Sequence, residues 1–187
     1  MNSLRAQNAI RELLLALSLD PTCEDLRDTP RRVADMLIEQ CTEKDSELEV
    51  TFSEQVFGGM VIVRNVPFVS WCAHHLVPFF GRADIGYIPN GKKLGLSKLA
   101  RLVYSCSVGF TTQETITARI ADTLYDNDGV GCLGCMVILE AEHGCMSLRG
   151  AKALGSSTVM SEVRGVFKDK LEVRQEMLLL ISRGGSR

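Results

Sequence analysis

The sequence predicts an α+β fold in which the strands come as adjacent pairs. Two helical segments are followed by two strands, two helices, two more strands and a last helix. Strands that follow one another directly form antiparallel hairpins, whereas parallel strands need a long crossover, usually a helix, between them. We therefore expect an antiparallel sheet with helices packed on it, and not a doubly wound parallel sheet.

Apolar residues that recur three and four positions apart predict the helices. The first helix is expected over residues 4–19, where leucines recur on one face. The second begins at Asp28-Thr29-Pro30, a capping residue followed by proline at a first helical position. Later helices are expected over 97–103, 111–125 and 171–181.

The strands are predicted from β-branched content and from alternation of apolar and polar residues. Residues 60–69 are rich in valine and isoleucine, and residues 84–88 alternate well enough for a second strand. The turn-forming sequence Pro89-Asn90-Gly91 follows. Two further strands are expected over 136–139 and 158–167.

The order of elements predicts three parts of the chain. They are an N-terminal helical segment (residues 1–50), which ends in a charged, solvated connection over 43–49, a domain over 51–183, and a disordered tail over 184–187.

Composition limits the partners that the chain attracts. The 187 residues carry a net charge of −2, which gives no overall attraction to nucleic acid or to an anionic membrane. An anionic ligand would therefore need a local cluster of basic side chains. No apolar run approaches the roughly 18 residues of a membrane-spanning helix, and the polar N-terminus does not resemble a secretory signal. The seven cysteines, an odd number, favour reduced thiols in the cytoplasm.

All three histidines lie beside a cysteine. His74 and His75 follow Cys72, and His143 precedes Cys145 by two positions. Thiolate and imidazole are preferred zinc ligands, and imidazole also transfers protons near neutral pH. These five groups suffice for three metal ligands, with an open fourth position, and two proton-transfer residues. The alternative, buried cysteines with core or surface histidines, leaves their co-location unexplained.

A second cysteine motif is Cys132-Leu133-Gly134-Cys135. A C-x-x-C pair can be half of a structural zinc site or a redox motif. No matching second pair exists in the sequence, and the motif does not open a helix after a strand. Coincidence in a glycine-rich turn is the favoured interpretation.

Two helix starts carry groups that suit either a ligand or a cap. Ser97, Lys98 and Arg101 open one helix, where backbone N–H groups favour an anion. Ordinary capping by Ser97 beside two solvated cations is an equally good interpretation. Thr111-x-x-Glu114 has the pattern of a capping box, which the residues alone favour over a ligand role for Glu114.

Five separated motifs, in register between residues 28 and 167, together resemble the GTP cyclohydrolase I family. They are Ser70-Trp71-Cys72-Ala73-His74-His75-Leu76-Val77-Pro78-Phe79, Gly86-Tyr87-Ile88-Pro89-Asn90, Leu94-Gly95-Leu96-Ser97-Lys98-Leu99-Ala100-Arg101, Gln113-Glu114 and residues 140–150. The family hydrolyses GTP at carbon 8 of the purine, releases formate and closes a pterin ring, giving 7,8-dihydroneopterin triphosphate. Folate, biopterin and 7-deazaguanine pathways all begin with this reaction.

The resemblance assigns roles residue by residue. It implies Zn²⁺ as the cofactor, with Cys72, His75 and Cys145 as ligands, and His74 and His143 as proton-transfer residues. A zinc with three protein ligands lowers the pKa of bound water toward 7.

It further implies that Glu114 recognises guanine and that Gln113 supports the same base. A carboxylate can accept two parallel hydrogen bonds from guanine that adenine cannot offer. The groups implied for the triphosphate are Ser97, Lys98, Arg101, Arg149 and Arg32.

The fold implied by the resemblance is the tunnelling fold, a four-stranded antiparallel sheet with two helices on one face, over residues 51–183. Such sheets have open edges, which need pairing. The family joins them into pentameric barrels, stacks two barrels into a homodecamer and places its active sites between subunits. A site built by several subunits would explain how a chain of net charge −2 collects cations for a triphosphate.

Several residues depart from the family pattern. Ala73 replaces a usual glutamate and Asp35 a frequent lysine. Val108 and Gly109 replace a basic pair, and Thr115 replaces an arginine. Two alternatives to an active cyclohydrolase therefore stay open. One is a tunnelling-fold relative that acts on another purine or pterin, or stops after ring opening, and the other is a non-catalytic binding subunit.

Overall fold

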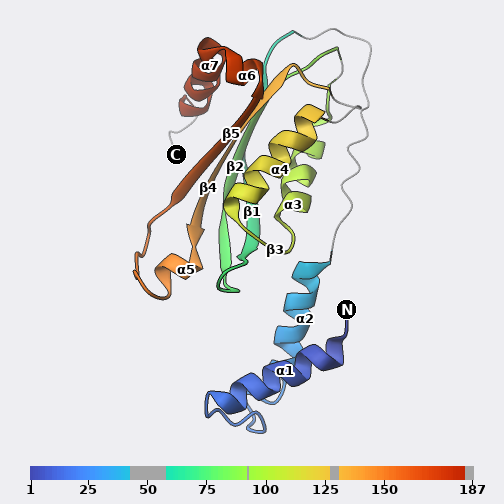
Figure 1. Ribbon diagram of the computed structural model, residues 1–187, viewed down its shortest axis with the longest axis vertical. Helices are drawn as coiled ribbons and strands as arrows, with labels where there is room; N and C mark the ends of the chain where they lie inside the picture. Colours follow the sequence, from blue (N-terminus) through green and yellow to red (C-terminus); the bar gives the residue numbers. More distant parts are fainter. Residues whose placement is uncertain (43–57, 92, 127–130, 184–187) are drawn as a thin grey trace. The chain divides into compact units, whose positions relative to one another are not determined.

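The computed structural model describes residues 1–42, 58–91, 93–126 and 131–183 (Figure 1). Contacts divide the chain into two units, Met1–Glu43 and Lys44–Arg187. The expected charged connection and the expected disordered tail lie outside the described residues. None of the described helices is both long and apolar enough to cross a membrane.

The first unit contains two helices, α1 (Ser3–Ala16) and α2 (Thr29–Cys41). Asn2 caps α1, because its side chain accepts a hydrogen bond from the backbone N–H of Arg5 at 2.9 Å. Pro30 lies in the first turn of α2 as expected. Asp28 precedes α2, but its carboxylate contacts Arg32 at 3.5 Å and makes no capping hydrogen bond.

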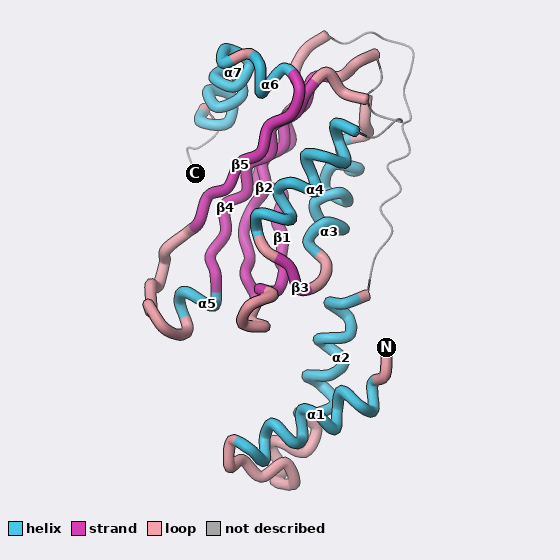
Figure 2. Tube along the Cα trace, viewed as in Figure 1, coloured by secondary structure: helices cyan, strands magenta, loops and turns pink. Residues whose placement is uncertain are grey.

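The second unit is built on one sheet with the strand order β3-β1-β2-β4-β5 (Figure 2). Its strands are β1 (Val61–Cys72), β2 (Pro78–Ile88), β3 (Phe110–Thr111), β4 (Gly134–His143) and β5 (Thr158–Gly165). The four long strands pair antiparallel, which confirms the predicted α+β class. The two-residue β3 adds a short parallel pair at the end of β1.

Helices cover both faces of this sheet. On one face lie α3 (Leu96–Ser107) and α4 (Gln113–Asp126), packed over the main core. This is the arrangement of two helices on one face that was predicted. On the other face, α6 (Val166–Asp169) and α7 (Leu171–Ser182) enclose a smaller core around Met136 and Met177. Gly86 permits this approach, because a Cβ atom there would lie 2.4 Å from the sulfur of Met177.

The strand boundaries differ from those expected, and β1 and β4 continue to Cys72 and His143, beyond the expected ends at residues 69 and 139. The second strand begins at Pro78 and not at residue 84. The last strand ends at Gly165, whose φ of 55° turns the chain into α6, and therefore excludes Phe167.

Candidate metal and catalytic site

Sheet pairing brings the two cysteine–histidine motifs to one end of the sheet. Trp71 near the end of β1 lies opposite Pro78, the first residue of β2. Phe79 on β2 lies opposite His143, the last residue of β4. The short helix α5 (Gly144–Ser147), which contains Cys145, therefore starts beside the β1–β2 turn.

The β1–β2 turn is held by backbone hydrogen bonds around Cys72. The Cys72 N–H donates to the carbonyl of Val77, and the Leu76 N–H donates to the carbonyl of Cys72, both at 2.9 Å. Leu76 closes the turn with a φ of 53°. The side chain of Cys72 is thus buried, whereas His74 and His75 are exposed.

Cys72, His75 and Cys145 form a cluster of three donors. Their ligand atoms all lie within 4.8 Å of one another, and Cys72 Sγ lies 3.7 Å from His75 Nδ1. Tetrahedral zinc with the usual bond lengths separates its ligand atoms by about 3.5–3.8 Å. The cluster therefore fits a zinc ion with small side-chain movements, and the exposure of His75 leaves one side open.

The electrostatics of the two thiols also suit a cation. Burial, followed by the neighbouring Cys72 thiol, raises the pKa of Cys145. Two adjacent thiols resist joint deprotonation because the thiolates repel each other, and a divalent cation reverses that preference.

Two further side chains lie at the rim of this cluster. His74 Nδ1 is 4.0 Å from Cys72 Sγ. Arg149, implied for the triphosphate, places Nη1 2.6 Å from His75 Nε2. Because a guanidinium only donates, Nε2 accepts this hydrogen bond. An exposed cation thus lies directly beside the three-donor cluster.

His143 is held by two contacts. Its ring stacks on Phe79 with a centroid distance of 4.6 Å and an interplanar angle of 4°. Its Nε2 lies 2.7 Å from Oε1 of Gln113, a fully buried residue. Desolvation lowers the pKa of His143, and the negative charge of Glu114 opposes this shift.

Glu114 is exposed at the start of α4, and the capping-box interpretation of it is wrong. Thr111 belongs to β3, so it does not occupy the capping position. Thr112 takes that role, since its Oγ1 accepts the N–H of Thr115 at 3.3 Å. The carboxylate of Glu114 is therefore not needed to start the helix, and its charge acts on His143.

The predicted anion group at α3 lies at the other end of the sheet. The N–H of Leu94 donates to the hydroxyl of Tyr87 near the end of β2, and α3 begins two residues later. β2 spans roughly 33 Å from this end to the cysteine cluster, and α3 runs back along it until Phe110, three residues after α3, pairs with Trp71. Ser97, Lys98 and Arg101 lie in the first half of α3, which is the half farther from Cys72.

The structure gives the local surroundings of two other predicted site residues. Gly95 precedes α3 as its capping residue without a side-chain bond, so the capping interpretation of Ser97 is wrong. Arg32, the remaining residue implied for the triphosphate, belongs to the first unit and is exposed beside Asp28.

The C-x-x-C motif packs beneath α4. Cys132 and Cys135 are buried, and their thiols donate to the carbonyls of Leu124 and Ala121 at 3.3 and 3.4 Å. Both cysteines lie outside the three-donor cluster.

The departures from the family pattern have local partners. Thr115 completes the cap of α4 with Thr112, and Asp35 contacts Arg31 at 3.5 Å on α2. The Ala73 N–H donates to the carbonyl of Thr111 at 3.1 Å. Gly109 has a φ of 96°, which side chains rarely adopt.

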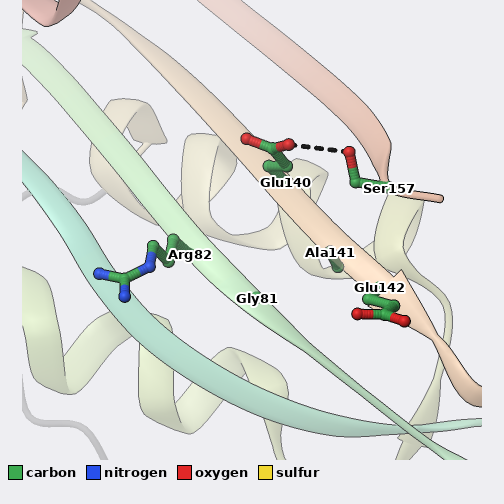
Figure 3. A pocket seen from close by; sticks show the side chains of 6 residues that line it. All are labelled: Gly81, Arg82, Glu140, Ala141, Glu142 and Ser157. Carbon is green, nitrogen blue, oxygen red and sulfur yellow. Dashed lines mark hydrogen bonds between the residues drawn. The ribbon is translucent and has the colours of Figure 1, made fainter. Parts of the chain in front are cut away.

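A separate pocket of about 300 Å³ lies on the sheet face opposite α3 and α4 (Figure 3). Its lining includes Arg82, Glu140, Glu142 and Ser157, with a hydrogen bond from Ser157 to Glu140 at 2.8 Å. It contains none of the predicted site residues, and its two carboxylates disfavour a triphosphate.

The sheet, its two covering helices and the Cys–His–Cys cluster define a tunnelling-fold protein with a potential metal site. Residues 6–182 match the family model described as GTP cyclohydrolase I. The chain is 44% identical to GTP cyclohydrolase 1 of Streptococcus agalactiae over 98% of this chain and 99% of that protein. It is 42% identical to GTP cyclohydrolase 1 of Bacillus subtilis, covering 98% and 97%. A solved archaeosine synthase QueF-like structure matches with a TM-score of 0.48 and 14% identity, over 59% of this chain and 97% of that chain. The chain belongs to the GTP cyclohydrolase I family.

Proposed function

We propose that this chain is a zinc-dependent GTP cyclohydrolase I. It hydrolyses GTP at carbon 8, releases formate and closes the ring to 7,8-dihydroneopterin triphosphate. The observation that carries this proposal is the Cys72–His75–Cys145 cluster, beside which β4 places His143, in a member of this family.

Cys72, His75 and Cys145 would hold the zinc ion. A zinc ion held there would lower the pKa of a water toward 7 and would so supply the nucleophile for carbon 8. His143, held flat against Phe79, moves protons at the reacting purine as a general acid and base. His74, exposed at the rim of the cluster, is the second proton-transfer residue.

Glu114 selects the base and Arg149 meets the phosphates. The exposed carboxylate of Glu114 accepts two hydrogen bonds from the ring N–H and amino group of guanine. Arg149 lies beside the cluster, and its guanidinium donates to a phosphate oxygen when GTP binds.

The position of the basic groups on α3 favours an oligomer. Ser97, Lys98 and Arg101 lie in the half of α3 that is farther from Cys72, so we assign their contacts with the triphosphate to a second copy. The described part of β5 pairs with β4 on one side, so its other edge can receive a neighbouring strand. The assembly that we propose is the one that the family resemblance implies, a homodecamer of two pentamers, with Arg32 also contributing to the phosphate site. The seven free cysteines suit the reducing cytoplasm, where we place the protein. Its ligand is GTP, and we expect it to bind neither nucleic acid nor a membrane.

Incubation of the purified, zinc-loaded protein with GTP tests the reaction. We expect equal amounts of formate and of a pterin that becomes fluorescent on oxidation. His143→Ala is the matched control: zinc content is kept and turnover falls on the order of 100-fold or more. Formate without pterin would identify an enzyme that stops after ring opening. Neither product would contradict cyclohydrolase activity.

Arg149→Ala is expected to weaken GTP binding far more than guanosine binding, because only GTP offers phosphate oxygens to the guanidinium. Raised salt should weaken GTP binding to the native protein for the same reason. Titration of both ligands measures the difference, with the exposed Arg82→Ala on the opposite face of the sheet as control. Equal losses for the two ligands would place Arg149 at the base and not at the phosphates.

A further inference from the structure

We infer that Gln113 is a positioning residue that fixes the tautomer of His143, and that it does not contact guanine. This inference rests on the proposed function, in which His143 transfers protons. It differs from the role that family resemblance gives to Gln113, which is support of the base.

The first step is the orientation of the Gln113 amide. Its Nε2 lies 2.9 Å from the carbonyl oxygen of Leu139 and 2.9 Å from that of Thr158. Carbonyl oxygens only accept hydrogen bonds, so the amide group that faces them is the NH₂ donor. The two neighbours, one on β4 and one on β5, therefore exclude the flipped amide.

The orientation of the Gln113 amide determines which nitrogen of His143 carries the proton. With NH₂ directed at the carbonyls, Oε1 is the atom that faces His143 Nε2 at 2.7 Å. An amide oxygen only accepts, so Nε2 must carry the proton of the imidazole. In neutral His143 the lone pair is then on Nδ1, and this nitrogen is the one that exchanges protons with the substrate. Stacking on Phe79 fixes the plane of the same ring.

All hydrogen-bonding atoms of the Gln113 side chain have partners within the protein. Both amide hydrogens and the oxygen have protein partners at 2.9 Å or less, and the residue is 0% exposed. Contact of this side chain with guanine would break these bonds, which hold it between the two carbonyls and His143. Glu114 follows on α4, about 100° further round the helix, and is exposed. The buried Gln113 thus positions His143, and the exposed Glu114 is left to recognise guanine.

The tautomer is measurable without any variant. Nitrogen-15 NMR of the zinc-loaded protein with labelled histidine distinguishes an Nε2–H imidazole from an Nδ1–H imidazole. Because the chain has only three histidines, the His143→Ala spectrum assigns the signal. We expect the Nε2–H form for His143, and a mixture of both forms in Gln113→Leu. An Nδ1–H form in the native protein would overturn the inference, even if Gln113→Leu failed to fold.

A double-mutant cycle separates positioning from base binding. Gln113→Leu should lower kcat on the order of 10–100-fold, the usual effect of removing an outer hydrogen-bond partner, with the KM for GTP within about twofold. In the His143→Ala background the same change should cause no further loss. Gln175→Leu on α7 controls for the substitution itself. A raised KM, or an undiminished effect without His143, would instead show that Gln113 binds the base.

The activity of the protein and the tautomer of His143 are tested separately. If the native protein made no pterin from GTP, the proposed function would fall. The tautomer of His143 in that same protein would still decide whether Gln113 fixes it.

Discussion

Cys145→Ala is expected to release the metal and abolish turnover. The native protein should contain about one zinc per chain, since the three donors supply three of the four positions of one tetrahedral site and leave the fourth open. Removing one thiolate leaves a thiolate and an exposed imidazole, which are too few ligands for a site of this kind. Metal analysis of the purified variant, beside its activity on GTP, measures both effects.

Control variants use the remaining cysteines. Cys23→Ala changes an exposed thiol in the first unit, and Cys132→Ser changes a buried thiol outside the cluster. Both should keep the metal content of the native protein. Undiminished zinc in Cys145→Ala would show that the cluster is not the metal site. Loss of zinc from His74→Ala, with zinc kept in His75→Ala, would make His74 the ligand.

The order of helices and strands was predictable because each long element repeats its pattern several times. The first half of β2 was missed because both of its faces are apolar near Pro78. Phe79 is fully buried, whereas Phe80 remains 52% exposed, so no alternation marks the strand. Strand β3 was missed because two residues are too few to form a pattern.

That short strand also explains a wrong interpretation. Phe110 and Thr111 pair with Trp71 and Cys72, which takes Thr111 out of the helix start and moves the cap to Thr112. A tertiary contact thus overrides a local capping motif, and no local signal reveals it.

The cysteine and histidine groups of the site could be predicted from their types and spacing, but their assembly depends on sheet register. The role of Gln113 could not be predicted, because its partners Leu139 and Thr158 act through backbone carbonyls, which any residue supplies. The direction of α3, which begins near the far end of β2 and returns toward the cluster, is not contained in the sequence motifs.

Glu114→Ala is expected to lower GTP affinity on the order of 100-fold or more while the fold stays intact. Two charge-assisted hydrogen bonds to guanine would be lost, and such bonds contribute roughly 1.5–3 kcal/mol each. The helix should tolerate the change, because Thr112 and not Glu114 satisfies the first turn of α4. Loss of a carboxylate near the helix N-terminus should cost about 0.3–1 kcal/mol of stability.

Glu172→Ala is the matched control for this prediction. Glu172 is the second residue of α7, as Glu114 is the second residue of α4, and both are exposed. Each variant should therefore lose a similar, small amount of stability in thermal unfolding, since each removes one acidic group from a first turn. Only Glu114→Ala should lose GTP and guanosine together, because the carboxylate reads the base that both ligands share. A change in melting temperature with unchanged affinity for both ligands would return Glu114 to a structural role and leave guanine recognition to another residue.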